Sequence, residues 1–199
     1  MARPREFDEN YVLMAAARCF WAQGYELTSI RDLVESTGIT SASLYNAFGD
    51  KRGIYARALD HYVDRSIADR IRRCRELPPR AALDGFFDDI LTRSLADPDH
   101  KGCMLVNAAL EVAPHDPGFR RVVAQVLIQI ETFFTDCIIA GQADGSITGA
   151  LPARDLAAQL LGALIGVRTL ARVRPEPELL KAIVRSALAL VDRPSTAAA

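Results

Sequence analysis

The segment TGITSASLYNAFGDK, residues 37–51, carries the side chains best suited to form a binding site. Between Glu35 and Asp50 the chain has neither an acid nor a base, and its polar groups are hydroxyls, one phenol and one amide. The ammonium of Lys51 follows directly after Asp50. Uncharged donors and acceptors of this kind suit two roles. The segment is either a polar piece of core or a surface shaped to lie against another molecule.

Two short helices are expected on either side of Gly38, at about 29–36 and 41–47. Ser29 opens a capping-box spacing for the first helix, and Thr40 is a suitable N-cap for the second. The apolar residues of this region recur at helical spacing and are expected to face inward: Ile30, Leu33, Val34, Ile39, Leu44 and Phe48. This arrangement is typical of a helix-turn-helix.

In a helix-turn-helix the second helix enters the DNA major groove and leads with its N-terminal residues. Thr40, Ser41 and Ser43 occupy that leading edge, where short hydroxyl side chains can bond either donors or acceptors on base edges. Tyr45 and Lys51 stand where a phenol and an ammonium contact backbone phosphates. On periodicity alone, an ordinary helical hairpin with a solvated polar face is an equal alternative.

The composition excludes several classes of protein. The 199 residues are half hydrophobic with a net charge of -1, so any binding to a polyanion must come from local geometry. Four cysteines without a CxxC pair form neither a disulfide framework nor a zinc ribbon. The sequence has no Gly-rich phosphate loop, HExxH helix or GxSxG elbow. We therefore expect no enzyme activity, cofactor or metal.

Two further features bear on location. The N-terminal MARPREFDEN is charged where a signal peptide needs an apolar segment. The longest apolar stretch, residues 156–167, is shorter than the ~20 residues that span a bilayer. We expect a soluble, cytoplasmic protein with no membrane partner.

Apolar residues recur every three or four positions almost throughout, and alternating runs are absent. We therefore expect an all-α chain of about nine helices. Their expected ranges are 8–23, 29–36, 41–47, 50–74, 80–96, 102–112, 117–142, 153–172 and 177–191. Asp116 before Pro117 is a strong start signal. The tails 1–5 and 192–199 are expected to be disordered, with Arg3 and Arg5 either solvated or lying along DNA.

The stretch TSIRDLVESTGITSASLYNAFGDKRGIY, residues 28–55, resembles the N-terminal domain of the tetracycline-repressor (TetR) family of transcriptional regulators. The likeness covers residues 8 to about 60, and TS-IRDL, TGI and SLY–FGDK are specific in combination. It implies a dimeric, ligand-controlled repressor of a palindromic DNA operator. A three-helix DNA-binding head would occupy 1–52, an α-helical effector-binding and dimerisation body 53–191, and the tail 192–199.

The resemblance also implies a role for individual residues. The implied phosphate contacts are Thr28, Ser29, Tyr45 and Lys51, and the implied groove-facing residues are Thr40, Ser41, Ser43 and Asn46. This chain has Ser41 and Ala42 where many relatives carry Lys and Gly, and Asn46 where His is frequent. These departures concern the base preference rather than the binding mode.

Residues 156–171 are apolar nearly all the way round, so a helix there needs apolar neighbours on two sides. Either this is an unusually well-buried monomer core, or a second copy of the chain supplies one neighbour, as the resemblance implies. Helix 177–191 would complete a four-helix interface. The expected dimer contacts are Leu161, Gly162, Ile165, Gly166, Ile183 and Ala187. Two recognition helices held about one DNA turn apart would read a palindrome.

An effector site is expected along the helix at 102–112. Cys103, Asn107 and Glu111 form a polar stripe at four-residue spacing. They could orient a small, unidentified ligand in an apolar pocket whose expected lining is Phe87, Leu91, Met104, Phe133, Phe134 and Cys137. Alternatively, Asn107 and Glu111 face solvent or pin neighbouring helices.

Three other functions stay open. Cys103 follows a lysine and a glycine at a helix N-terminus, where dipole and cation favour thiolate, so it could sense oxidants or electrophiles. The protein could be a ligand-free helix-turn-helix adaptor controlled by a partner protein. The last class, an enzyme or carrier that retains the motif for packing, is the one we do not expect, because it would need a convergent acid, base and nucleophile and the sequence offers only Cys103 with Glu111 and a distant histidine.

Overall fold

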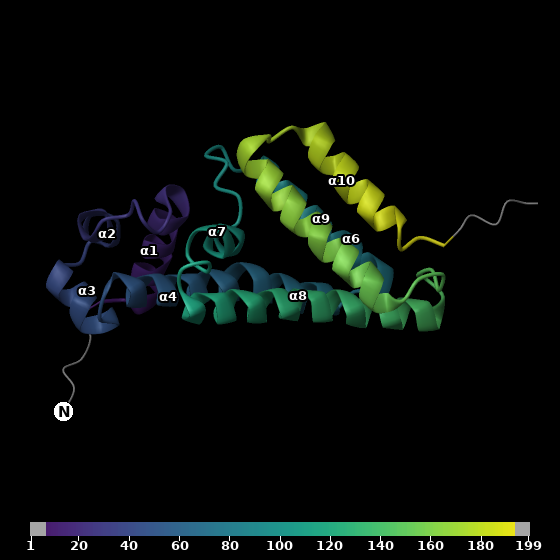
Figure 1. The fold of residues 1–199 in the computed structure, drawn as a ribbon, viewed down its shortest axis with the longest axis horizontal. Helices are drawn as coiled ribbons and strands as arrows, with labels where there is room; N and C mark the ends of the chain where they lie inside the picture. The colour runs from purple at the N-terminus through teal and green to yellow at the C-terminus, as the bar shows by residue number, and fades with distance from the viewer. Residues whose placement is uncertain (1–6, 194–199) are drawn as a thin grey trace, which may run out of the picture. The chain divides into compact units, whose positions relative to one another are not determined.

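Residues 7–193 are described by a computed structural model, and every regular element in this range is helical (Figure 1). The expected all-α class is confirmed. The elements are α1 (Glu9–Gln23), α2 (Ile30–Thr37), α3 (Ser41–Phe48), α4 (Lys51–Tyr62), η1 (Val63–Ala68), α5 (Asp69–Arg75), α6 (Pro79–Leu95), α7 (Met104–Glu111), α8 (Pro117–Asp144), α9 (Ala153–Val173) and α10 (Pro177–Ala189).

The helix expected at 50–74 is continuous but not uniform. It begins as α4, passes through the π-helical segment η1 over Val63–Ala68, and ends as α5. A π-helical turn carries more residues than an α-helical turn and is rare except as a short insertion. The apolar spacing that predicted the helix does not reveal this change of pitch.

The chain divides into two compact units. The first consists of the residues up to Ile67 together with 103–123, and the second consists of 68–102 together with the residues from Ala124 onward. The head expected at 1–52 therefore shares its unit with the rest of α4, with α7 and with the first residues of α8.

In the first unit α1 packs against α2 and α4, and α3 packs against α4. Val12, Ala16 and Phe20 of α1 are buried, as are the central residues of α2, α3 and α4. Tyr55 joins two parts of this core, because its ring lies 4.9 Å from the Phe20 ring and 5.2 Å from the Phe119 ring. The core thus fixes the start of α8 on the helices of the head.

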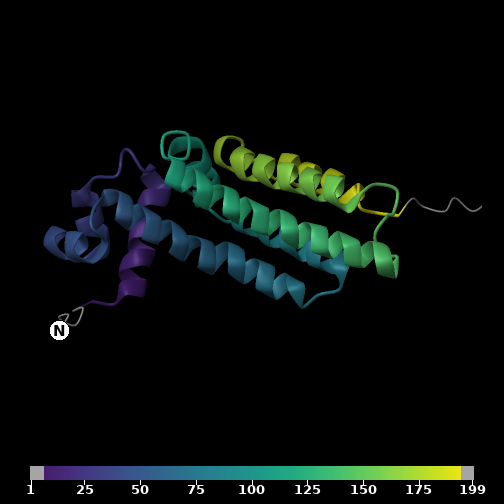
Figure 2. The same ribbon diagram turned by 60° about the horizontal axis from the view of Figure 1, so that its bottom comes forward.

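In the second unit α9 packs against α6 and α10, and α10 also contacts α6 (Figure 2). Four phenylalanines from α6 and α8 form one aromatic cluster with ring centroids 5.0–5.9 Å apart: Phe86, Phe87, Phe133 and Phe134. All four are fully buried. Their contacts hold α6 against α8 inside this unit.

Two described helices, Pro117–Asp144 and Ala153–Val173, are long and apolar enough to cross a membrane by length and composition alone. One or two such helices are weak evidence, because the core helices of soluble proteins pass the same test. Here α9 packs against α6 and α10.

The expected C-terminal tail begins inside the described region. Asp192 accepts hydrogen bonds from Nε and Nη2 of Arg80 at 3.1 and 2.9 Å, so this first residue of the expected tail is held against α6. The predictions for Arg3, Arg5 and residues 194–199 lie outside the described residues.

Candidate DNA-binding surface

Local capping signals set the boundaries of the helix-turn-helix. Ser29 caps α2 by accepting the N–H of Asp32 at 3.2 Å, while the Asp32 carboxylate accepts the N–H of Ser29 at 2.7 Å. The bonds that this carboxylate accepts from the N–H and the hydroxyl of Ser29 hold the pKa of Asp32 below its usual range. Gly38 ends α2 with φ 73°, and Thr40 caps α3 by accepting the N–H of Ser43 at 3.2 Å. The expected caps are confirmed.

Helix α3 has one apolar side and one uncharged polar side. Leu44, on the apolar side of this helix, is fully buried. Ser41 and Asn46 are exposed, and Tyr45 is 44% exposed, although it is a large aromatic residue. Such an uncharged face can approach base edges without the cost of stripping water from a charge.

Thr40 and Ser43 are less free than their exposure suggests. Their hydroxyls hydrogen-bond each other at 3.0 Å, in addition to the cap that Thr40 provides. Either oxygen can donate in this pair. The two hydroxyls therefore form one pre-oriented donor–acceptor pair at the N-terminus of α3 rather than two independent groups.

Lys51 begins α4, which Asp50 caps by accepting the N–H of Gly53 at 2.7 Å. The Lys51 ammonium donates to the carbonyl oxygen of Glu26 at 3.1 Å and lies 4.7 Å from the centroid of the Tyr25 ring. The turn between α1 and α2 thus holds the predicted phosphate-binding group in place. The sequence did not point to Tyr25 or Glu26, because nothing in their types or spacing indicates a contact with a lysine 25 or 26 residues away.

The prediction that Thr28 touches phosphate through its side chain is wrong. Thr28 is fully buried, and its hydroxyl donates to the carbonyl oxygen of Gly24 at 2.6 Å. Its role is to close the turn before α2. Ser29 is exposed, but its hydroxyl also donates to Asp32 at 2.7 Å and is tied into the cap.

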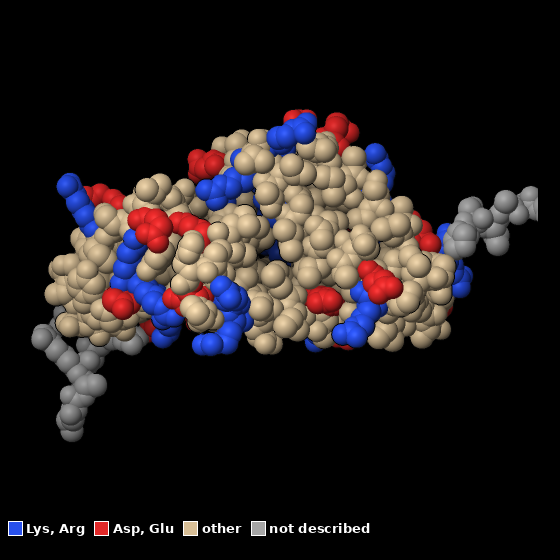
Figure 3. All heavy atoms as spheres, in the orientation of Figure 1, with Lys and Arg blue, Asp and Glu red and all other residues tan. Residues whose placement is uncertain are grey.

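Several cations of the first unit already have acidic partners. Arg52 is paired with Asp116 at 2.6 Å, and Arg57 is paired with Glu9 at 2.7 Å. On the face shown in Figure 3, basic and acidic atoms are interspersed rather than gathered into one basic patch.

The predicted effector residues of the first unit lie on α7 or at its start. Cys103 and Met104 are buried, and the Tyr62 hydroxyl donates to the Cys103 sulfur at 3.5 Å. Glu111 accepts the N–H of Glu26 at 2.9 Å. This hydrogen bond supports the alternative that Glu111 pins a neighbouring segment. The ligand role of these residues stays a prediction.

The remaining predicted effector residues lie in the second unit. The aromatic cluster contains Phe87, Phe133 and Phe134, which are fully buried and whose rings pack together. Leu91 and Cys137 are half-buried, and burial raises the pKa of the Cys137 thiol to about 11, which keeps it protonated at neutral pH. A ligand among these residues must bind beside the rings or displace one of them.

The second unit also has an open groove of about 430 Å³ that the sequence did not predict. Its walls come from α5 and α8 and include Ile71, Ile128, Arg72 and Arg75. Small-molecule sites have volumes of ~300–1,000 Å³. The volume of this groove falls in that range.

The predicted interface residues of α9 and α10 differ in exposure. Gly162 is exposed, Leu161, Ile165, Gly166 and Ile183 are half-buried, and Ala187 is buried inside its own unit. A Cβ built on Gly162 or Gly166 would meet no atom within 4 Å. The two glycines are therefore not required by packing within the chain.

The two capped helices, with the second presenting an uncharged outer face and a cation beside it, define a helix-turn-helix DNA-binding protein. Among the described residues, no three His, Cys, Asp or Glu side chains gather to hold a metal. Residues 12–58 match the family of bacterial regulatory proteins named after TetR, and residues 79–187 match the tetracyclin repressor-like C-terminal domain. The chain belongs to the TetR family of transcriptional regulators, and its relatives are DNA-binding regulators rather than enzymes.

Three relatives place it within that family. The HTH-type transcriptional regulator YezE of Bacillus subtilis is 33% identical over 75% of this chain and 77% of its own length. The HTH-type transcriptional repressor ComR of Escherichia coli is 35% identical over 56% of this chain and 54% of its own. A cysteine-substituted form of the TetR-family regulator CifR, solved with 26-bp operator DNA, has a TM-score of 0.84 and 30% identity, covering 96% of this chain and all of that one.

Proposed function

We propose that the protein is a homodimeric, cytoplasmic repressor that binds a palindromic operator and leaves it when a small effector binds the body. In this proposal the head at 1–52 reads DNA and the body at 53–191 binds the effector and the second copy. Ser41, Asn46 and the Thr40–Ser43 pair face the groove, while Ser29, Tyr45 and Lys51 contact phosphates.

The observation that carries the proposal is the exposed, uncharged outer face of α3. Its exposed residues are uncharged, Leu44 anchors it from behind, and Tyr45 and Lys51 border it. The similarity to an operator-bound relative over nearly the whole chain supports this use of the helix.

Dimerisation is supported by the outer face of α9. Gly162 and Gly166 leave that face without side-chain bulk, and within residues 7–193 no atom lies within 4 Å of a Cβ added at either position. A second copy can therefore approach closely along this helix. Two-fold symmetry would present two copies of α3 to a palindrome.

Regulation requires an effector that favours one arrangement of the two heads over another. The groove lined by Ile71 and Ile128, with Arg72 and Arg75 at its walls, supports the capacity of the second unit to hold a small molecule. Native mass spectrometry of the purified protein tests for a ligand that co-purifies. A mass equal to the bare dimer, together with no shift for any member of a small-molecule library, would refute this part of the proposal.

A thiol sensor at Cys103 is the second candidate. Cys103 is buried, and the Tyr62 hydroxyl donates to its sulfur. Lys101, the cation expected to favour thiolate, donates to the carboxylates of Asp97 and Asp99 at 2.7 Å each. The positive charge of Lys101 is therefore already balanced by two acids. This favours regulation by a bound effector over regulation by a thiol sensor at Cys103. If Cys103→Ser leaves release by oxidants unchanged, the thiol sensor is excluded.

The DNA-binding proposal is tested by selecting binding sites from a random-sequence duplex pool and measuring affinity over a salt series. Wild type should enrich a palindrome and bind it far more tightly than scrambled DNA. Tyr45→Ala should weaken binding with its melting temperature unchanged, and Tyr45→Phe should separate the hydroxyl from the ring. Failure of wild type to enrich any sequence at moderate salt would refute the proposal.

A further inference from the structure

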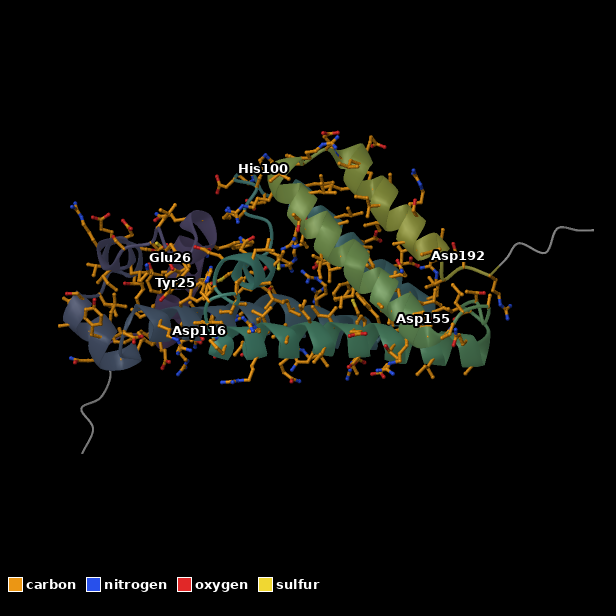
Figure 4. All side chains as sticks on the ribbon, in the orientation of Figure 1. Tyr25, Glu26, His100, Asp116, Asp155 and Asp192 are labelled. Atoms are coloured by element: carbon orange, nitrogen blue, oxygen red, sulfur yellow. The ribbon has the colours of Figure 1, made fainter. Side chains whose placement is uncertain are left out.

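The main chain of Glu26 is bonded on both sides by charged groups from other elements of the first unit. Its N–H donates to Oε1 of Glu111, the last residue of α7, at 2.9 Å. Its carbonyl oxygen accepts the ammonium of Lys51, the first residue of α4, at 3.1 Å. One residue of the turn between α1 and α2 (Figure 4) thus connects α7 to the predicted phosphate-binding lysine.

The turn is shaped to receive the Glu111 carboxylate. Gly24 has φ 87°, a region that favours glycine. A Cβ at Gly24 would lie 3.0 Å from both carboxylate oxygens of Glu111. The buried Thr28 hydroxyl holds the same turn by donating to the Gly24 carbonyl at 2.6 Å. The missing side chain at position 24 therefore leaves the space that the carboxylate occupies.

The position of Glu111 along α7 is costly unless it has such a partner. It is the last residue of the helix, where the exposed carbonyls carry a partial negative charge. A carboxylate there is repelled by the helix that carries it. The hydrogen bond from the Glu26 N–H offsets that repulsion, so the stability of α7 alone does not explain an acid at this place.

Lys51 is restrained from two sides by the same turn. The Tyr25 ring lies 4.7 Å from its ammonium, and that ring packs 4.9 Å from the buried Tyr55 ring. A free lysine side chain loses rotamer entropy when it binds a phosphate, and a side chain already held in place loses less. Holding the ammonium at the turn therefore prepares it for a backbone phosphate.

We propose that Glu111 is a positioning residue for DNA binding, which fixes the turn at Gly24–Glu26 and through it the ammonium of Lys51. This inference rests on the proposed function, because it assigns regulation to the same phosphate contact. It makes α7 the element that controls Lys51. Movement of α7 that withdraws the Glu111 carboxylate releases the turn and disorders the ammonium.

The test is a double-mutant cycle on the selected operator with Glu111→Ala, Lys51→Ala and both together, across a salt series. Each single variant removes one charge-assisted hydrogen bond from each protomer, so it should weaken binding of the dimer about a hundredfold, tenfold for each protomer. Each should also lower the slope of log affinity against log salt by about 1.8, because the dimer loses two phosphate contacts at about 0.9 each. The double variant should match Lys51→Ala, because Glu111 acts through that lysine.

Two further variants separate positioning from folding. Glu111→Gln keeps an oxygen that accepts the Glu26 N–H and should retain most of the affinity. Glu26→Ala removes an exposed carboxylate from the same turn but keeps both main-chain bonds, so it should bind at least as well as wild type. The melting temperature of each variant checks that it is folded. Titration with operator at a concentration far above the dissociation constant measures the fraction of each variant that can bind DNA.

The outcomes are distinct. Wild-type affinity and salt slope in Glu111→Ala would overturn the inference and leave the proposed function standing. An equal effect of Glu111→Ala in the wild-type and Lys51→Ala backgrounds would also overturn it, because the role would then be structural. A wild-type protein that selects no operator would refute the proposed function and the inference together.

Discussion

Asp116 holds Arg52 in a two-point ion pair, with its carboxylate accepting Nε at 2.6 Å and Nη2 at 3.1 Å. The same carboxylate caps α8 by accepting the N–H groups of Gly118 and Phe119 at 2.8 and 3.2 Å. The Arg52 guanidinium also lies 5.1 Å from the Phe119 ring. One side chain therefore both starts α8 and fastens that start to α4 within the first unit.

Asp116→Asn should destabilise the protein at neutral pH and have little effect in acid. Asparagine is also a good N-cap, so the variant removes the charge and keeps the cap. The bonds from Arg52 hold the pKa of Asp116 well below its usual range. Its contribution to stability is therefore present above the unfolded pKa of ~3.9 and is lost as the pH falls through the lower folded value.

The measurement is denaturant unfolding of wild type and Asp116→Asn at several pH values between 7 and 2. The difference in unfolding free energy should be largest at pH 7 and shrink below about pH 4. Arg52→Ala should reproduce the same pH-dependent loss. A difference between wild type and Asp116→Asn that stays constant across the range would contradict the ion pair's role.

Gly24→Ala should destabilise the protein more than Gly38→Ala does. Gly38 has the left-handed conformation, with φ 73° and ψ 7°, where alanine costs about 1–2 kcal/mol. Gly24, with φ 87° and ψ 170°, lies in a region essentially restricted to glycine, so its backbone penalty is larger. Only at position 24 does the new methyl group meet a neighbour, the Glu111 carboxylate, since nothing lies within 4 Å at Gly38. Denaturant titration measures the unfolding free energy of both variants.

The excess at position 24 has a direct check. Combining Gly24→Ala with Glu111→Ala removes the group that the methyl meets, so the double variant should lose less than the sum of the two single losses. Strict additivity would show that the carboxylate does not occupy the space beside Gly24.

The local parts of this structure could be predicted from the sequence, and the distant pairings could not. The caps at Ser29, Thr40 and Asp116 follow from residue types within three positions of each helix start, and all are present. Such signals act through neighbouring backbone groups, so they do not depend on the rest of the fold.

The sequence carries weaker signals for contacts between residues that are far apart in the chain. Glu111 follows Asn107 at helical spacing and fits a ligand stripe, but its carboxylate bonds to a turn 85 residues earlier in the chain. Thr28 has the right type for a phosphate contact, yet the fold buries it. A polar residue shows which bonds it can make, and only the packing decides which partner it meets.

Ser41→Lys should tighten binding to DNA at low salt and reduce its sequence preference. Ser41 is exposed at the first position of α3, so an added ammonium can reach a phosphate. Because the dimer gains one ammonium in each protomer, the slope of log affinity against log salt should steepen by about 1.8 for the selected operator and for scrambled DNA alike. An unchanged slope would show that position 41 does not approach the backbone.

Asp89→Ala should destabilise the second unit strongly. The Asp89 carboxylate accepts Nε of the buried Arg70 at 2.5 Å and Nε of Arg93 at 2.9 Å. Although burial pushes the pKa of Asp89 upward, the bonds from Arg70 and Arg93 outweigh it and hold that pKa below its usual range. Removing one partner of a buried ion pair costs about 3–5 kcal/mol.

The neighbouring Asp88 supplies the control. Asp88 is exposed, so Asp88→Ala should change the unfolding free energy by less than about 0.5 kcal/mol. Equilibrium unfolding in urea distinguishes the two variants. Equal losses for both would indicate that Asp89 contributes only surface charge.

Gly162→Arg should dissociate the proposed dimer without unfolding the protomer. Gly162 is exposed on α9, and a Cβ added there meets no atom of the described residues within 4 Å. Replacing a helical glycine also removes a backbone penalty of about 1 kcal/mol, so the protomer's helix should not weaken. In a dimer, however, a guanidinium would be buried against the partner's apolar surface, which is strongly unfavourable.

Analytical ultracentrifugation over a range of concentrations measures the effect, and circular dichroism checks the helix content. Ala124→Arg, an exposed substitution on α8, is the matched control and should leave the mass unchanged. Because a monomer presents a single copy of α3, Gly162→Arg should also lose affinity for the full palindrome but keep its weak affinity for a half-site. A variant that remains dimeric and binds the palindrome normally would place the interface away from this face of α9.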